Sequence, residues 1–275
     1  MEFLQAIVLG VVQGLTEFLP VSSSGHLVLF QSLFGMNEPE LLFDISVHVG
    51  TLVAVLAVFR AEILELVGTM FKIPGLVRKT GGFSNAYHQN ENVRLCVFIV
   101  LGTIPTVVLG LFFRHIADVI FGSTAVVGLM LLVTGITISL PRLLSGKTVP
   151  QKMTITHSLI IGIIQGLAII PGISRSGSTI STALLLGIDR KLAGRFSFLL
   201  SIPAIIGALI LGLKSPEIHT TMASVHVLLG AAAATISGYL ALIILLRLVE
   251  RGKLHLFAPY CFAVGAITII VGYLD

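Results

Sequence analysis

The chain has 275 residues, of which 55% are hydrophobic and only 11% are charged, and its mean hydropathy is +1.03. These values exclude a water-soluble globular domain and a disordered chain, and they predict an integral membrane protein. The net charge of +4 is small, and Cys96 and Cys261 lie within apolar segments, so no disulfide framework is indicated. The first ten residues lack a basic n-region, and we expect no cleaved signal peptide.

In chain order, the first apolar stretch is residues 4–34, which Gly, Pro and Ser interrupt in the middle. A continuous membrane helix does not cross such a break. We interpret the stretch as a re-entrant hairpin, in which a helix enters the membrane, turns at depth and returns to the side it came from. Residues 157–187 have the same interruption and predict a second hairpin. Six other stretches predict transmembrane helices: 43–59, 94–113, 119–140, 196–213, 225–246 and 255–274.

Lysine and arginine segregate between the two sides of this topology. Fourteen of the 17 lie on one side, Arg114 and Lys214 lie on the other, and Arg175 lies in the second hairpin. The positive-inside rule assigns the rich side to the cytoplasm, with residues 72–94 as a basic cytoplasmic loop, and places both termini outside. The basic excess therefore reports orientation, and we infer no nucleic-acid partner from it.

An internal repeat links the two hairpins. A shift of 152 residues aligns GVVQGLTEFLPVSSSG at 10–25 with GIIQGLAIIPGISRSG at 162–177. The first hairpin enters from outside and the second from the cytoplasm, so the repeats are inverted. We predict an all-α membrane protein with about six transmembrane helices plus the two hairpins. It would form one polytopic domain over 1–275, with inverted repeats at approximately 1–140 and 153–275 and a site near the membrane midplane.

The two copies of the repeat share a scaffold and differ in chemistry. Glu17, Ser23 and His26 belong to the first copy, and the second copy contributes Arg175. An ionisable side chain at membrane depth costs about 2.5–3.5 kcal/mol on insertion scales, so each is a candidate functional residue. A purely structural ion pair between Glu17 and Arg175 is the alternative. We interpret His26 as the proton carrier or the nucleophile for P–O cleavage, in preference to a structural histidine.

The segment PGISRSGST at 171–179 predicts a phosphate site. A helix N-terminus with free N–H groups and a fork-shaped guanidinium both bind phosphate oxygens. Without Arg175, the serines of this segment, Ser174 and Ser176 among them, would be interpreted as an ordinary N-cap.

Gln13 and Glu17 are four residues apart and share one helix face. Their oxygens predict a weak site for a hard divalent cation, Mg²⁺ or Ca²⁺, which phosphate would complete. Alternatively, Glu17 is an acid–base partner of a hydroxyl or the imidazole. By contrast, we interpret Asp44 and His48, at the outer end of the first span, as interfacial or packing residues.

Through QGLTEFLPVSSSGH at 13–26 and PGISRSGST at 171–179, the chain resembles the bacterial undecaprenyl pyrophosphate phosphatase family, whose members also confer bacitracin resistance. The length and hydrophobic pattern match over essentially the whole chain. The resemblance implies hydrolysis of undecaprenyl pyrophosphate to the monophosphate plus phosphate, assisted by a divalent cation, which recycles the lipid carrier of cell-wall synthesis. It also implies a bacterial plasma (inner) membrane protein, and the charge count predicts a site open to the outer face.

The resemblance also implies roles for single residues. The family's acidic motif falls on Gln13 and Glu17, its hydroxyl-histidine loop on Ser22, Ser23 and His26, and its phosphate-binding arginine on Arg175 with Ser174, Ser176 and Thr179 beside it. Some relatives have Glu where this chain has Gln13, which leaves Glu17 as the main acid. Our hypothesis is that Ser23 attacks phosphorus or orients water while His26 manages protons, with a phosphohistidine at His26 as the competing scheme.

The predicted partners are a polyprenyl pyrophosphate lipid, the bilayer and a second copy of the chain in a homodimer, and no nucleic acid is expected. Two rival functions remain open. The letters SSGH and SR echo type 2 phosphatidic acid phosphatases, but the expected histidine after SR is Ser181 here and no K-x6-RP segment exists. A transporter or lipid flippase is the other rival, because inverted repeats with broken helices are also a transporter design.

Overall fold

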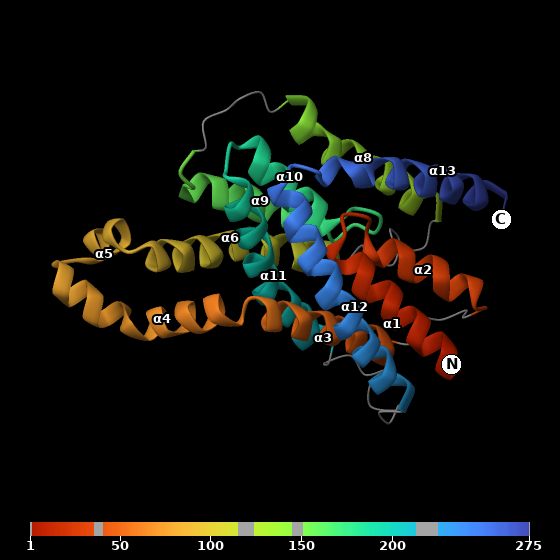
Figure 1. The fold of residues 1–275 in the computed structure, drawn as a ribbon, viewed down its shortest axis with the longest axis horizontal. Helices are drawn as coiled ribbons and strands as arrows, with labels where there is room; N and C mark the ends of the chain where they lie inside the picture. The colour runs from red at the N-terminus through yellow and green to blue at the C-terminus, as the bar shows by residue number, and fades with distance from the viewer. Residues whose placement is uncertain (1, 36–40, 115–123, 145–150, 213–224, 275) are drawn as a thin grey trace.

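The computed structural model describes residues 2–35, 41–114, 124–144, 151–212 and 225–274. These residues form helices and turns, and within them the only β contact is an isolated bridge between Gln151 and Ile188. In chain order the helices are α1 (Phe3–Phe18), α2 (Ser23–Leu33), α3 (Leu41–Val58), α4 (Arg60–Thr80), α5 (Phe83–Gln89), α6 (Glu91–Arg114), α8 (Thr124–Leu144), α9 (Ile155–Leu167), α10 (Arg175–Leu185), α11 (Arg190–Gly212), α12 (Val225–Glu250), the 3₁₀ turn η2 (Leu254–Phe257) and α13 (Ala258–Leu274) (Figure 1).

Both interrupted stretches fold as helix-turn-helix hairpins. The first consists of α1 and α2, and the second of α9 and α10. These helices have 16, 11, 13 and 11 residues, whereas about 20 residues are needed to cross a bilayer, so each of them is too short to span alone. The prediction of two hairpins is confirmed.

Five of the described helices are long and apolar enough to cross a membrane: α6, α8, α11, α12 and the segment Leu254–Gly272, which comprises η2 and most of α13. The sixth predicted span corresponds to α3, which passes the same test only together with α4, and the two helices are bent by 81° at their junction. The predicted all-α membrane fold is therefore confirmed. Residues 119–123 and 213, which the sequence assigned to spans, lie outside the described residues.

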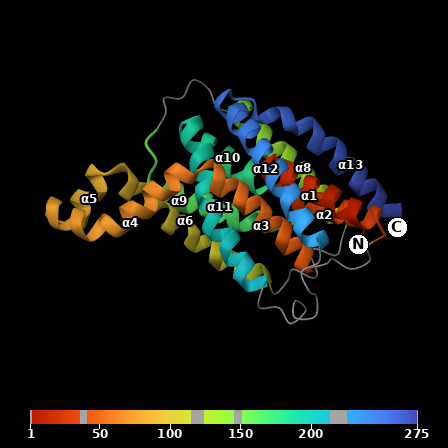
Figure 2. The same cartoon turned by 60° about the horizontal axis from the view of Figure 1, so that its bottom comes forward.

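The prediction of a basic loop at 72–94 is wrong, because this region is mostly helical. Helix α4 continues to Thr80, ends at Gly81 in the left-handed conformation (φ 78°), and is followed by α5. The segment was interpreted as a loop because it is basic, but lysine and arginine are good helix formers. The part of α4 that precedes it packs against α6, where the Cys96 thiol donates to the Leu66 carbonyl at 3.8 Å. Figures 1 and 2 show α4 and α5 projecting from the rest of the molecule.

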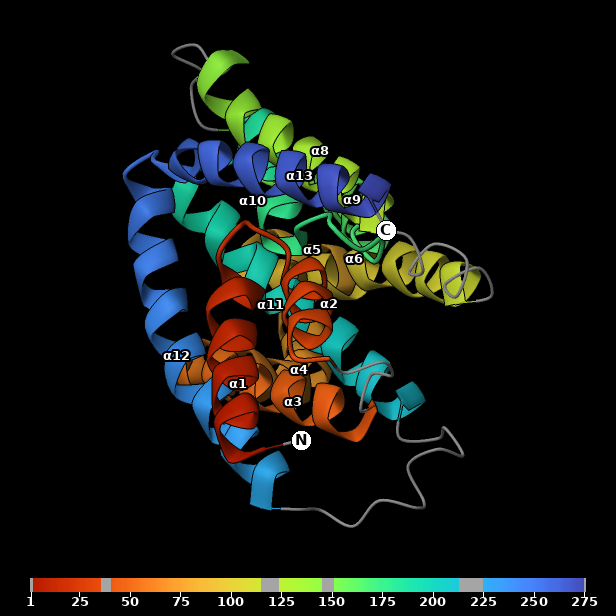
Figure 3. The same cartoon turned by 90° about the vertical axis from the view of Figure 1, so that its right-hand side faces the viewer.

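The long helices pack in pairs around the hairpins. Helix α13 lies along α8, and α12 packs on both α1 and α3 (Figure 3). Helix α9 of the second hairpin packs against α6. Buried apolar side chains from both hairpins and the long helices, including Phe18, Ile138, Ile180 and Phe198, form the main hydrophobic core. The division into inverted repeats at approximately 1–140 and 153–275 stays a prediction.

Glycines let the hairpin helices approach their neighbours closely. A Cβ atom on Gly14 of α1 would lie 2.5 Å from the Ala234 carbonyl oxygen of α12, and one on Gly162 of α9 would lie 2.1 Å from the Gly102 carbonyl oxygen of α6. Small residues at such crossings are how membrane helices gain packing contacts. Gly10 aligns with Gly162 in the repeat, and a Cβ atom there would lie 2.3 Å from the Gly230 carbonyl oxygen of α12, so both aligned glycines let their hairpin pack closely against a long helix.

We predict that Gly162→Ala destabilises the protein by about 1–3 kcal/mol, because the added methyl group meets backbone that has no rotamer to change. The midpoint of thermal unfolding in detergent measures this loss. Gly207→Ala on α11 is the matched control, since a Cβ there meets no atom within 4 Å. Equal midpoints for the two variants would contradict the close packing of α9 on α6.

Candidate active site

The turns of the two hairpins meet inside the protein. The Gly172 N–H of the second turn donates to the Ser22 hydroxyl of the first at 3.1 Å. Gly172 has a φ of 91°, and a Cβ there would lie 2.4 Å from the Val127 carbonyl oxygen, so only glycine fits. Ser22 also has a left-handed backbone, with φ 69°, which costs a non-glycine residue about 1–2 kcal/mol. Such an outlier persists only where surrounding contacts determine it, and it points to a functional turn.

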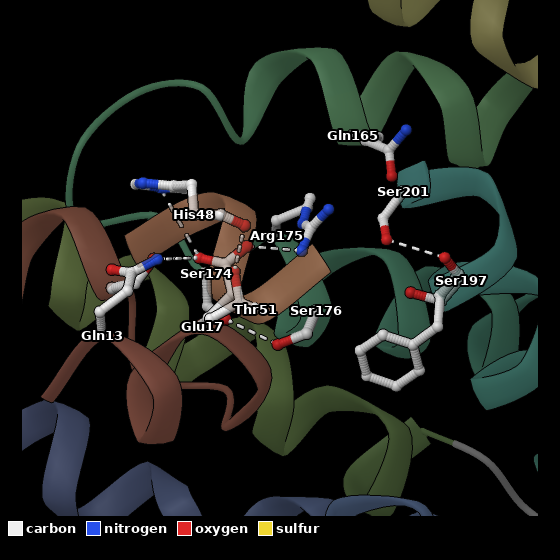
Figure 4. Close-up of polar contacts among 12 residues, drawn as sticks. Gln13, Glu17, His48, Thr51, Gln165, Ser174, Arg175, Ser176, Ser197 and Ser201 are labelled. Atoms are coloured by element: carbon white, nitrogen blue, oxygen red, sulfur yellow. Dashed lines mark hydrogen bonds and ion pairs between the residues drawn. The ribbon is translucent and has the colours of Figure 1, made fainter. Parts of the chain in front are cut away.

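Glu17 is the centre of the polar cluster formed at this meeting point (Figure 4). Its Oε1 accepts a hydrogen bond from Arg175 Nη2 at 2.7 Å, across the two hairpins. Its Oε2 accepts from the Ser23 hydroxyl at 2.6 Å and from Gln13 Nε2 at 3.1 Å. The exposed fractions of the Glu17 and Arg175 side chains are 8% and 17%, so the two charges depend on each other for compensation. The structure brings together four of the residues that the sequence singled out.

Two atoms of this cluster are buried without a partner. Arg175 Nη1 and Gln13 Oε1 make no hydrogen bond with any group among the described residues. A buried, unsatisfied polar group in a folded protein needs an explanation, and a ligand is one. Arg175 is the first residue of α10, where the Ser174 hydroxyl caps the helix by accepting the Gly177 N–H at 3.1 Å. A free guanidinium N–H beside a helix N-terminus is suited to phosphate oxygen atoms.

The predicted phosphate-binding hydroxyl groups have protein partners in this structure. Ser174 and Ser176 lie 3.2 Å apart through their hydroxyl oxygens, and the Thr179 hydroxyl donates to the Arg175 carbonyl at 2.8 Å. Thr179 also lies 2.5 Å from the hydroxyl oxygen of Ser197. Together with the bond from Gly172 to Ser22, these contacts build and hold the two turns.

His26 lies at the same turn, but the contacts described for its ring nitrogens are with Ser22 and Tyr260 and not with Glu17. The Nδ1 atom lies 2.8 Å from the Ser22 carbonyl oxygen, and Nε2 lies 2.7 Å from the Tyr260 hydroxyl at the start of α13. The side chain is buried, with 4% of the residue exposed. Both ring nitrogens are therefore engaged. Tyr260 was not anticipated from the sequence, because nothing in its apolar surroundings indicates a contact 234 residues away.

His48 of α3 is the second residue that sequence reasoning missed. Its Nε2 lies 4.0 Å from Glu17 Oε2, and its Nδ1 lies 2.7 Å from the Asp44 carbonyl oxygen (Figure 4). The sequence placed His48 among interfacial or packing residues. Packing of α3 beside α1 also brings its imidazole near the carboxylate, which the sequence did not indicate. The His48 side chain is 36% exposed, so it lies at the edge of the cluster, on the surface of the protein. No pattern in the sequence indicates that the face of α3 with His48 packs against the first hairpin.

The cluster contains few metal ligands of its own. Within the described residues, no group of three or more His, Cys, Asp and Glu side chains could hold a metal ion. However, Gln13 Oε1 accepts no hydrogen bond from any described residue, and Glu17 offers carboxylate oxygens beside it. Mg²⁺ is commonly bound by one or two carboxylates plus substrate phosphates, so this donor set fits a cation that the substrate helps to bind.

The fold and the site define a class: a multi-pass helical membrane protein with a buried acid, hydroxyl and guanidinium cluster assembled from two hairpins. The family model described as Bacitracin resistance protein BacA matches residues 6–267, and the chain belongs to this family. A protein named undecaprenyl-diphosphatase from Desulfatibacillum aliphaticivorans is 49% identical over 99% of this chain and 100% of its own length. Proteins with the same name from Desulforapulum autotrophicum and Methanosphaera stadtmanae are 48% and 44% identical, over 99% and 98% of both chains.

Proposed function

We propose that this chain is a membrane phosphatase that hydrolyses undecaprenyl pyrophosphate to undecaprenyl phosphate and inorganic phosphate. The activity predicted from the sequence agrees with the names of relatives that match along the whole chain. The single structural observation that carries the proposal is the Ser23 hydroxyl, held 2.6 Å from Glu17 Oε2 while Glu17 also binds Arg175. A hydroxyl hydrogen-bonded to a carboxylate that a third group orients is the arrangement of an activated nucleophile.

In the first step, Ser23 Oγ attacks the terminal phosphorus and its proton passes to Glu17 Oε2. The bond between that phosphorus and the bridging oxygen breaks, and undecaprenyl phosphate leaves with the electron pair. Arg175 Nη1, which makes no hydrogen bond within the described part of the chain, and the N-terminal N–H groups of α10 stabilise the charge on the phosphoryl oxygens. We assign the proton to Glu17 in preference to His26, because both His26 nitrogens are engaged by Ser22 and Tyr260.

In the second step, water attacks the phosphoserine and the bond from phosphorus to Ser23 Oγ breaks. Glu17 returns its proton to Ser23, and inorganic phosphate leaves. The one water proton that phosphate does not keep passes to solvent. Glu17 thus acts as base in the first step and acid in the second, which microscopic reversibility allows a single carboxyl group to do. Attack by His26 is the competing scheme, and it requires one ring nitrogen to leave its present partner.

We also propose that a divalent cation, Mg²⁺ or Ca²⁺, binds together with the substrate, held by Gln13 Oε1, Glu17 and pyrophosphate oxygens. Gln13 Oε1, which is buried and has no hydrogen-bond partner among the residues that the structure describes, supports this proposal. The cation would neutralise charge on the phosphate groups of the lipid. Ser22, Ser174, Ser176 and Thr179 would then act through the shape of the two turns, since their hydroxyl groups already have protein partners.

The proposed function is tested by purifying the protein in detergent and measuring inorganic phosphate released from undecaprenyl pyrophosphate with Mg²⁺ present. Release that Glu17→Ala and Arg175→Ala abolish would support hydrolysis. If the wild type releases no phosphate, or if both variants release it normally, the proposal is wrong. Transport of the lipid across liposome membranes without release would instead favour the transporter alternative.

We propose further that the protein resides in the bacterial plasma membrane, with both termini outside and the site open to the outer face. Lys72, Arg78 and Lys79 of α4 support this orientation, because basic residues concentrate on the cytoplasmic side. The predicted homodimer stays a prediction.

The orientation predicts where engineered cysteines react. Native Cys96 and Cys261 are buried, so they contribute little background labelling. A membrane-impermeant maleimide should label Glu38→Cys, which lies outside the described residues, in intact cells. It should label Ser84→Cys, on the exposed surface of α5, only after the cells are permeabilised. The opposite pattern would overturn the orientation.

A further inference from the structure

Two neighbouring residues at the start of α13 fasten the turn of the first hairpin. The Tyr260 hydroxyl lies 2.7 Å from His26 Nε2, and the Cys261 thiol donates to the Pro20 carbonyl at 3.3 Å. The rings of Tyr260 and His26 are nearly parallel, with an interplanar angle of 12° and centroids 5.7 Å apart. The last helix of the chain therefore contacts both sides of the turn that contains Ser22.

The hydrogen bonds of His26 determine which ring nitrogen carries the proton. A backbone carbonyl oxygen only accepts, so Nδ1, 2.8 Å from the Ser22 carbonyl, must be the protonated nitrogen. In the neutral ring, Nε2 then has a lone pair and accepts from the Tyr260 hydroxyl. Tyr260 thus favours the tautomer that donates to Ser22 and also fixes the orientation of the ring.

The orientation of the Ser22 carbonyl affects the position of the Ser23 hydroxyl. Ser22 has the left-handed backbone, and Ser23, the next residue, begins α2 with its hydroxyl 2.6 Å from Glu17. The other side of Ser22 is held by the Gly172 N–H, which donates to its hydroxyl. A rotation of the peptide group between Ser22 and Ser23 would move the Ser23 hydroxyl relative to both Glu17 and the reacting phosphorus.

From these contacts we infer that Tyr260 is a positioning residue for the phosphatase reaction, acting through His26 on the Ser22 turn. The inference rests on the proposed function and assigns a role to a residue that no motif of the chain contains. Tyr260 does not touch Glu17 or Arg175 in the described structure. Its hydroxyl instead orients the imidazole, the imidazole holds the Ser22 carbonyl, and the turn presents Ser23 to Glu17.

Tyr260→Phe tests the inference, because it keeps the ring and removes only the hydroxyl. We expect kcat for phosphate release to fall by about 10- to 100-fold, because a small displacement of a reacting group has an effect of this size. KM should stay near the wild-type value. Tyr239→Phe on α12 is the matched control, since Tyr239 is an exposed tyrosine of another membrane helix, and its kcat should not change.

A double-mutant cycle separates positioning through His26 from a general packing role. If Tyr260 acts through the imidazole, Tyr260→Phe should lower kcat no further in a His26→Ala background. If the fold-losses in kcat of the two single variants multiply in the double variant, the inference is wrong. It is also wrong if Tyr260→Phe alone has the kcat of the wild type. These outcomes are distinct from failure of the proposed function, in which the wild-type protein would release no phosphate at all.

Discussion

Ser23→Ala protein should release inorganic phosphate from undecaprenyl pyrophosphate at least about 1,000-fold more slowly than the wild type, because loss of a nucleophile removes the covalent route entirely. The substitution removes one hydroxyl, and its only described hydrogen bond is the one donated to Glu17. Folding should be little affected, so the unfolding midpoint in detergent should stay close to that of the wild type. Initial rates of phosphate release at saturating lipid measure the effect.

Ser24→Ala is the control for this variant. Ser24 is the next residue of α2, and its hydroxyl lies 3.3 Å from the Ser22 hydroxyl and makes no described contact with Glu17. We expect its rate within about threefold of the wild type, as for a substitution away from reacting groups. A Ser23→Ala protein as active as Ser24→Ala would show that Ser23 is not the nucleophile.

Glu17→Gln should reduce kcat by about 100- to 10,000-fold, the range over which a positioned acid–base group contributes. Glutamine keeps the size of the side chain and removes the charge that accepts the Ser23 proton. It also leaves the Arg175 guanidinium buried without a counter-charge, so the protein should lose about 3 kcal/mol of stability. Both kcat and the unfolding midpoint in detergent must be measured, because unfolding alone would also abolish activity.

The double variant Glu17→Gln/Arg175→Gln separates these two effects. Removing both charges eliminates the uncompensated guanidinium, so the unfolding midpoint should recover toward the wild type. Activity should not recover, because neither the base nor the phosphate-binding fork remains. Recovery of activity together with stability would mean that the pair is purely structural, which is the alternative that the sequence left open.

The hairpins could be predicted from the sequence because the residues that interrupt each apolar stretch act on the backbone at their own position. Gly, Pro and Ser in the middle of an apolar stretch exclude a continuous helix wherever they occur, and the 152-residue repeat showed that both halves keep the break. The placement of Glu17 and Arg175 in one site followed from the same repeat, since it aligned the two turns and identified their ionisable residues, Glu17 and His26 in the first and Arg175 in the second. Charge in an apolar segment is a strong signal because its cost in the membrane is high.

The contacts of the histidines could not be predicted in this way. Whether His48 or His26 faces Glu17 depends on how α3 and α13 pack on the first hairpin, and neither packing leaves a periodic pattern in the chain. The sequence favoured His26 because it follows Ser23 by three residues and ends a polar loop inside a membrane segment. The structure directs that ring to Tyr260 and brings His48 to the carboxylate.

Helices α4 and α5 were missed for a related reason. The basic residues of 72–94 indicated a loop by composition. Helix α4 nevertheless continues from its packed part, where Leu66 and Thr69 are buried, through residues 72–80, none of which is buried. Lysine and arginine are good helix formers, so a basic composition does not exclude a helix.

The most direct test of the account is the identity of the phosphorylated residue during turnover. Wild-type protein is mixed with undecaprenyl pyrophosphate labelled at its terminal phosphate, quenched within the first turnover and digested, and the labelled peptide is located by mass spectrometry. The account predicts acid-stable phosphate on Ser23, absent from Ser23→Ala and greatly reduced in Glu17→Gln. Acid-labile phosphate on His26, or product formation in the first turnover with no phosphorylated protein, would contradict it.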